Sequence, residues 1–115
     1  MYTAKYATSN IAPSTTDGLI ITGKVGKVMR VVGGFLVCAG TATSITFNSK
    51  PIGSGTAITS AIACGANGGL AMTSPPQIAL GEPPYGYFET AKGDGLSATT
   101  GSGSSIGVSL VYIEI

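Results

Sequence analysis

Residues 95–115 read "GLSATTGSGSSIGVSLVYIEI", and this stretch decides the fold class. In its first part, Leu96 and Ala98 alternate with Ser97 and Thr99, which is the period of two found in β-strands. The alternation resumes after a short turn rich in glycine and serine, and the closing "VYIEI" places apolar side chains on both faces. We therefore predict strands over 95–100 and 106–114, the second lying centrally in a sheet or against a partner.

The rest of the chain carries the same signature. Helical periodicity is nearly missing, and Gly, Thr, Ser, Val and Ile dominate, which disfavours helices and favours strands. Turn residues separate many short strands, a pattern typical of an antiparallel sandwich or barrel. We predict an all-β fold with eight or nine strands, a single antiparallel β-sandwich of the jelly-roll type. The expected strands are 2–7, 19–23, 27–39, 43–49, 56–63, 69–73, 85–91, 95–100 and 106–114.

Three segments interrupt this regular pattern. The long run 27–39 contains Gly33–Gly34, which predicts a bulge or bend where the strand could pass between sheets. Residues 1–18 are interpreted as an N-terminal strand or arm and connector, mobile and polar over 8–18, ahead of a sandwich domain over 19–115. Four of the six prolines fall in 74–86, which predicts a stiffened surface loop.

Composition limits the classes of function. The 115 residues fit one domain, and only 10% are charged, with a net charge of +1, so no basic stripe is available for nucleic acid. No apolar run approaches the roughly 18 residues of a membrane-spanning helix. A mean hydropathy of +0.40 with so few charges indicates apolar surface that is buried against other subunits, and we expect a homo-oligomer, most simply a trimer.

Residues suited to catalysis are scarce. The chain has no histidine, which excludes Ser–His–Asp and Cys–His nucleophiles, and its five carboxylates are scattered. Neither a zinc ligand cluster nor grouped calcium ligands occur. Of the two cysteines, Cys38 is expected to be a buried free thiol and Cys64 to be more exposed. We predict a protein that is not an enzyme and has no cofactor, metal or catalytic residue.

The stretch "AKGDGL" at 91–96 raises the question of a phosphate-binding loop. Such a loop leads into a helix, whereas Gly95 leads into an alternating strand. Asp-Gly is a strong hairpin signal, so we interpret Lys92–Gly95 as a hairpin turn between two antiparallel strands. A Lys-Gly-Asp motif that presents its carboxylate to a receptor is a much weaker alternative.

Tyrosines beside the proline-rich loop and near the chain ends could serve in three ways. They could pack the ends of the sandwich, form a protein interface or bind sugars. The apolar residues of the loop and the two-faced last strand are further interface candidates. The full set of protein-interface candidates is Tyr2, Tyr6, Ile78, Leu80, Tyr85, Tyr87, Val111 and Ile113.

Residues 23–115 resemble the small jelly-roll β-sandwich proteins of tailed bacteriophages, among them the capsid decoration, or cement, proteins. The resemblance lies in the order of "GKVGKVMRVVGG", "TSITFNSKPIGSGTAIT", "CGANGG" and "GYFETAKGDGLSATTGSGSSIGVSLVYIEI". It implies a virion protein made in the host cytoplasm and located on the capsid surface. Its partner would be the major capsid protein or another virion protein, and its role would be to stabilise the shell. The alternative is a receptor- or glycan-binding module of a phage fibre or tail.

Overall fold

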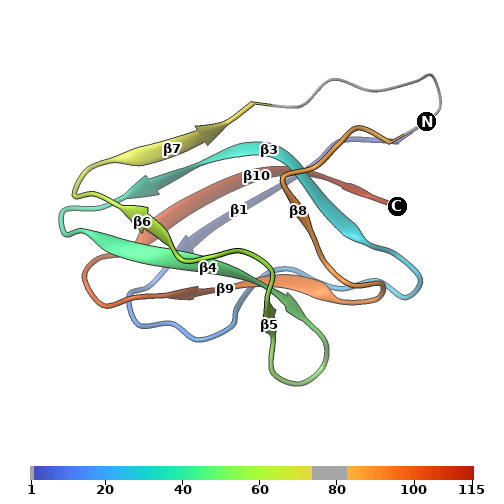
Figure 1. Ribbon diagram of the computed structural model, residues 1–115, viewed down its shortest axis with the longest axis horizontal. Coiled ribbons are helices and arrows are strands. Elements are labelled where there is room, and N and C mark those ends of the chain that lie inside the picture. Colours follow the sequence, from blue (N-terminus) through green and yellow to red (C-terminus); the bar gives the residue numbers. More distant parts are fainter. Residues whose placement is uncertain (1, 74–82) are drawn as a thin grey trace.

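The computed structural model describes residues 2–73 and 83–115, which form two antiparallel β-sheets packed face to face (Figure 1). This confirms the predicted all-β fold and the two-layer sandwich. The described residues contain ten strands. In chain order they are β1 (Lys5–Ile11), β2 (Gly18–Ile21), β3 (Met29–Cys38), β4 (Thr43–Lys50), β5 (Thr56–Ala57), β6 (Ile62–Cys64), β7 (Gly69–Met72), β8 (Phe88–Glu89), β9 (Gly95–Thr100) and β10 (Ile106–Glu114).

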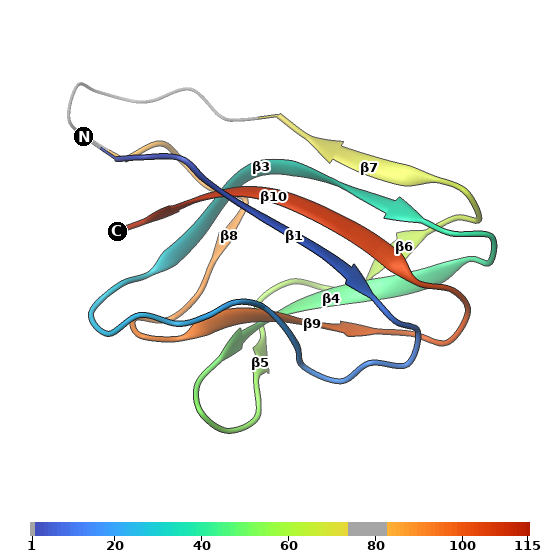
Figure 2. The same ribbon diagram turned by 180° about the vertical axis from the view of Figure 1, so that it is seen from behind.

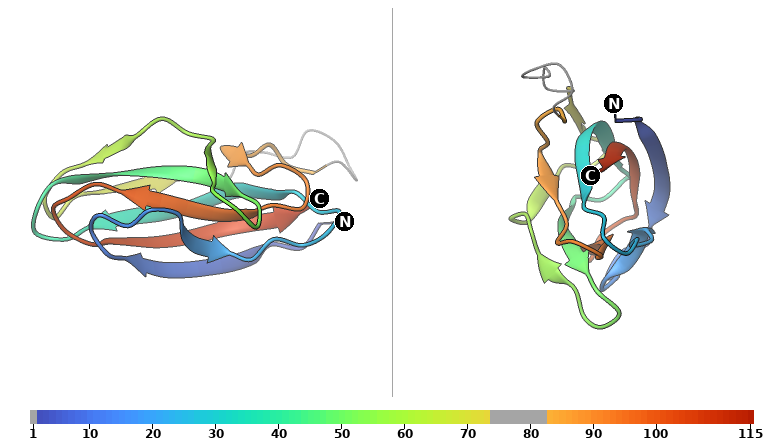
Figure 3. Two further views of the ribbon diagram at one scale, coloured as in Figure 1. Left: turned by 90° about the horizontal axis from the view of Figure 1, so that it is seen from below. Right: turned by 90° about the vertical axis from the view of Figure 1, so that its right-hand side faces the viewer.

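Within the described residues each sheet contains five strands, drawn from both halves of the chain. Sheet A has the order β1-β10-β3-β7, and β8 also pairs with β3 (Figure 2). Sheet B has the order β2-β9-β4-β5, and β6 also pairs with β4. The chain therefore passes from one sheet to the other repeatedly, and the edge-on view shows the two layers (Figure 3).

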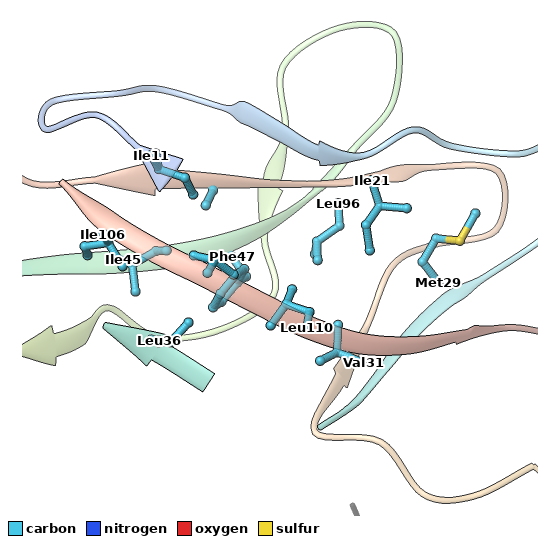
Figure 4. Packing of buried hydrophobic residues seen from close by; sticks show 12 residues of the cluster. Ile11, Ile21, Met29, Val31, Leu36, Ile45, Phe47, Leu96, Ile106 and Leu110 are labelled. Atoms are coloured by element: carbon cyan, nitrogen blue, oxygen red, sulfur yellow. The ribbon is translucent and has the colours of Figure 1, made fainter. Parts of the chain in front are cut away.

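The core lies between the two sheets and is built from the inward residues of both. Figure 4 shows side chains of this buried cluster, with Phe47 among them. The ring of Phe47 on β4 also stacks on that of Phe88 on β8, with the ring centroids 4.7 Å apart. Full burial of one large apolar side chain stabilises the folded state by about 1.5–3 kcal/mol. Each strand therefore turns its apolar face toward the core. The buried cluster is Ile11, Ile21, Met29, Val31, Leu36, Ile45, Phe47, Leu96, Ala98, Ile106, Val108 and Leu110.

The two strands that the opening stretch predicts are confirmed with their bounds, 95–100 and 106–114. β10 lies centrally in sheet A between β1 and β3, as its apolar side chains on both faces indicated. The bulge expected in the third strand is also present, because the register of β10 with β3 shifts between Val111 and Tyr112. β3 nevertheless stays within sheet A, so the expected passage between sheets is wrong. The strand expected over 56–63 divides into β5 and β6.

The segment 8–18 is not the mobile arm that its polar composition suggested. β1 pairs with β10 along its whole length, and Ile11 at its end belongs to the buried cluster. The residues that follow are held as well, because the amide of Thr15 donates to the hydroxyl of Thr100 at 3.0 Å. Polarity misled the interpretation because an edge strand needs apolar residues on only one face.

The turn within "AKGDGL" is confirmed, but it does not form a hairpin. The Asp94 amide donates to the carbonyl of Ala91 at 3.0 Å, which closes the turn. Its two flanking strands belong to different sheets, since β8 pairs with β3 whereas β9 pairs with β2 and β4. The Asp94 carboxylate accepts a 2.8 Å hydrogen bond from the Ser49 hydroxyl, so it is engaged within the fold.

Two further expectations concern single segments. Cys64 is buried like Cys38, and with 6% of its surface exposed against 2% it is only slightly the more exposed of the two. Residues 74–82 of the proline-rich loop, including the candidates Ile78 and Leu80, lie outside the described residues. No helix in the described part of the chain is long and apolar enough to cross a membrane.

Candidate interaction surface

The outer surface of sheet A is made by the side chains that point away from the core. On β1 the exposed residues alternate with residues directed toward the core, which end at Ile11. Antiparallel pairing continues the outward positions of β1 across the sheet in rows, because directly paired residues share a face. One row is Thr8, Ser109, Phe35 and Ala71; the next is Asn10, Gly107, Val37 and Gly69; and Tyr6 pairs with Val111 in a third. We call these ten residues the outer A face.

The outer A face carries no charged residue, and its large exposed side chains are aromatic or aliphatic. Tyr6 is 78% exposed, Phe35 51% and Val37 49%. The solvent-facing side of an antiparallel sheet is normally polar, and grouped apolar side chains there mark a surface that binds something. The side chains between these larger ones are small, so a partner could approach the strands closely.

Packing within the chain does not require a glycine at position 107, on the outer A face. A Cβ atom at Gly107 would meet only the carbonyl oxygen of Val37, at 3.9 Å, which is ordinary contact. Gly69, in contrast, is required by the fold, because a Cβ there would lie 2.5 Å from the carbonyl oxygen of Leu36. A shallow depression of about 230 Å³ borders Gly107 and Val37 at the edge of the outer A face.

The outward side of sheet B is different in character. Asn48 and Ser97 point outward from β4 and β9 but are buried, because the carboxylate of Asp17 lies over them. That carboxylate accepts hydrogen bonds from Asn48 at 2.9 Å, from the amide of Gly55 at 3.0 Å and from Ser97 at 3.3 Å. These hydrogen bonds, above all that from Gly55, hold the pKa of Asp17 below its usual value. The side chains of Asn48 and Ser97 thus find their hydrogen-bond partners within the chain.

Charged groups gather at the ends of the strands. Glu114 accepts from Lys5 at 3.1 Å and lies 3.5 Å from Lys24, and the hydrogen bond from Lys5 lowers the pKa of Glu114. Arg30 pairs with Glu89 at 2.8 Å. In residues 2–73 and 83–115, no group of three or more His, Cys, Asp or Glu side chains could hold a metal ion.

The described interface candidates fall into three groups. Tyr6 and Val111 lie opposite each other on the outer A face. Tyr85 and Tyr87 are exposed on the segment that leads into β8, where the hydroxyl of Tyr87 hydrogen-bonds to Thr73. The remaining two are Tyr2, which is exposed near Lys5 and Glu114, and Ile113, which is buried and so contributes no surface.

Phe35 and Val37 were not among the predicted candidates, although they lie on the outer A face. They alternate with Leu36 and Cys38 in "FLVC", a run that is apolar on both faces. The same two-faced pattern identified the last strand as a candidate. It could have identified this run too, but pattern alone does not tell which apolar face meets the core.

Comparison with known proteins found no match to a family, to a curated relative or to a solved structure.

Proposed function

We propose that this chain is a capsid decoration protein of a tailed bacteriophage, which binds the assembled shell through the outer A face. The observation that carries the proposal is the pairing of half-exposed Phe35 and Val37 with small, uncharged neighbours across four strands. A flat apolar sheet face suits broad docking against another protein surface, because its buried area is contributed by many small contacts.

The strand order supports the jelly-roll fold that such proteins share. When β5 and β6 are counted as one position, and β7 and β8 as another, the described chain changes sheet at every step except between β4 and the β5/β6 position. This gives eight positions in two four-position sheets, with first and last strands adjacent in sheet A. A jelly roll is built from two such sheets.

The mechanism follows from mass action. A protein that binds the assembled shell but not its separated parts stabilises the shell by a free energy that grows with its concentration relative to Kd. Three linked copies would dissociate more slowly than one, because each bound copy keeps the others at high local concentration. Trimer formation is therefore part of the proposal.

Binding to purified shells assembled without this protein tests the proposal. We expect the double variant Phe35→Thr/Val37→Thr to lose at least tenfold in affinity, while threonine preserves strand propensity. The matched control is Val25→Thr/Ile52→Thr, which removes two fully exposed apolar side chains in loops away from sheet A. Equal binding by both double variants, each with an unchanged melting temperature, would contradict attachment through the outer A face.

One observation favours the alternative of a receptor- or glycan-binding module. Tyr85 and Tyr87 are exposed on the same segment as Glu89, whose carboxylate is held by Arg30. Aromatic side chains beside a carboxylate are suited to sugar binding. If this function is correct, Tyr85→Ala should reduce binding to host cells and leave shell binding unchanged.

A further inference from the structure

The two cysteines of the chain come from opposite sheets and meet at one end of the sandwich. Cys38 ends β3 in sheet A, and Cys64 ends β6 in sheet B. Cys38 is 2% exposed and Cys64 6%. Because the chain contains no other cysteine, each thiol has only one possible partner within the molecule.

Backbone hydrogen bonds hold the two segments side by side. The turn after Cys64 donates from the Asn67 amide to the carbonyl of Ala39 at 2.8 Å. The carbonyl oxygen of Gly68 accepts from the Cys38 amide at 2.8 Å and from the Cys64 thiol at 3.9 Å. Both cysteines therefore contact the same oxygen atom.

The thiols are also placed by their own contacts. The Cys38 thiol donates to the carbonyl of Thr41 at 3.2 Å, two residues before Thr43, which pairs with Cys64 in sheet B. Burial is the largest cause that raises the pKa of Cys64, and the neighbouring Cys38 thiol adds to it. The closed sandwich consequently favours the neutral thiol at Cys64.

We propose that Cys38 and Cys64 form a disulfide that joins sheet A to sheet B when the protein meets an oxidising disulfide such as oxidised glutathione. The convergence of the Cys38 amide and the Cys64 thiol on the Gly68 carbonyl, with both cysteines buried, carries this inference, which is independent of the shell-binding proposal. Since β6 is a three-residue edge strand, its local opening gives the oxidant access.

The reaction proceeds by two thiol–disulfide exchanges. One cysteine thiolate attacks a sulfur of oxidised glutathione, forms a mixed disulfide and releases one glutathione thiolate. The second cysteine then attacks the protein sulfur of the mixed disulfide and releases the other glutathione. Two protein thiols are oxidised, one glutathione disulfide is reduced to two thiols, and the two cysteine protons pass to solvent or to the released thiolates.

Oxidation should raise the melting temperature. The disulfide would close the loop between residues 38 and 64, which restricts the unfolded chain and raises the melting temperature by roughly 10 °C. Dithiothreitol should reverse the shift. The double variant Cys38→Ala/Cys64→Ala should melt at the same temperature in oxidised and reduced glutathione.

The direct test uses the wild-type chain, so it does not depend on any variant folding. The protein is equilibrated with oxidised glutathione, its remaining thiols are alkylated, and the denatured chain is cleaved with chymotrypsin, which cuts between the cysteines at Phe47. We expect a disulfide-linked pair of peptides containing Cys38 and Cys64, with a monomer on a non-reducing gel. Alkylated thiols, glutathione adducts or a disulfide-linked dimer as the main product would overturn the proposal.

Discussion

The side-chain amide of Asn48 donates a 2.9 Å hydrogen bond to the carboxylate of Asp17, which ties the central strand β4 to the segment before β2. Asp17 has a positive φ of 51°, and its backbone amide donates to the side-chain hydroxyl of Thr99 on β9 at 3.2 Å. The Asp17 carboxylate thus connects three parts of the chain: β4, β9 and the loop that precedes β5.

The first prediction concerns acid sensitivity at Asp17. Because the folded state lowers the pKa of Asp17, its contribution to stability is complete above the unfolded value near 3.8 and is lost as pH falls through the folded value. Asp17→Asn should cost about 1–2 kcal/mol at pH 7, since asparagine tolerates the positive φ but cannot accept the same hydrogen bonds.

Chemical denaturation of both proteins between pH 7 and pH 2 checks this prediction. The difference between them should shrink below pH 4. Protonation of Glu114, whose pKa is also lowered, occurs in both proteins and cancels in the comparison. A difference that is constant with pH would show that the carboxylate charge is not the cause.

The second prediction concerns Gly34, which follows the bulge in β3 and pairs with Leu110 on β10. Gly34 has a φ of 128°, and a Cβ atom there would lie 2.2 Å from the carbonyl oxygen of Ser109 on β10. Gly34→Ala should therefore destabilise the fold by about 3 kcal/mol or more. Gly40→Ala is the matched control, since a Cβ there meets nothing within 4 Å, and it should stay within about 0.5 kcal/mol. Equal melting temperatures for the two variants would contradict the close approach of β3 and β10.

The third prediction concerns the "AKGDGL" turn. The positive φ, 90°, belongs to Gly93, whereas Gly95 is required because a Cβ there would lie 2.4 Å from the carbonyl oxygen of Ile21. Gly95→Ala should cost about 1–3 kcal/mol, and Lys92→Ala should be neutral within about 0.5 kcal/mol. Neither ATP nor GTP should shift the melting temperature. A nucleotide-dependent shift that Lys92→Ala removes would restore the phosphate-loop interpretation.

The fourth prediction concerns β1. Ile11→Ala should cost about 2–5 kcal/mol, because it leaves a cavity in the core. Its exposed neighbour Asn10 is the control, and Asn10→Ala should change stability by less than about 0.5 kcal/mol. Deletion of residues 1–12 should cause unfolding or aggregation, since it would uncover the edge of β10. A soluble, folded truncated protein would contradict the role of β1 as part of sheet A.

Sequence pattern predicted those features that depend on local alternation. The alternation of Leu96 and Ala98 with Ser97 and Thr99 predicted both the bounds of β9 and the face that packs on the core. The apolar residues on both faces of "VYIEI" indicated a central strand. The partners of a strand depend on contacts far along the chain, so Asp94–Gly95 predicted a turn but not which strands it joins. The outer A face depends on the same distant pairings, which is why Tyr6 and Val111 were predicted without Phe35 and Val37.

Imaging of intact particles by electron cryo-microscopy would show both where this chain lies in the virion and which face it turns toward its partner. We predict density for this chain on the outside of the capsid, with the outer A face, marked by Tyr6, Phe35 and Val37, turned toward the shell or a sister subunit. Density confined to the tail or a fibre, or a capsid-bound chain whose outer A face points to solvent, would contradict attachment to the shell through the outer A face.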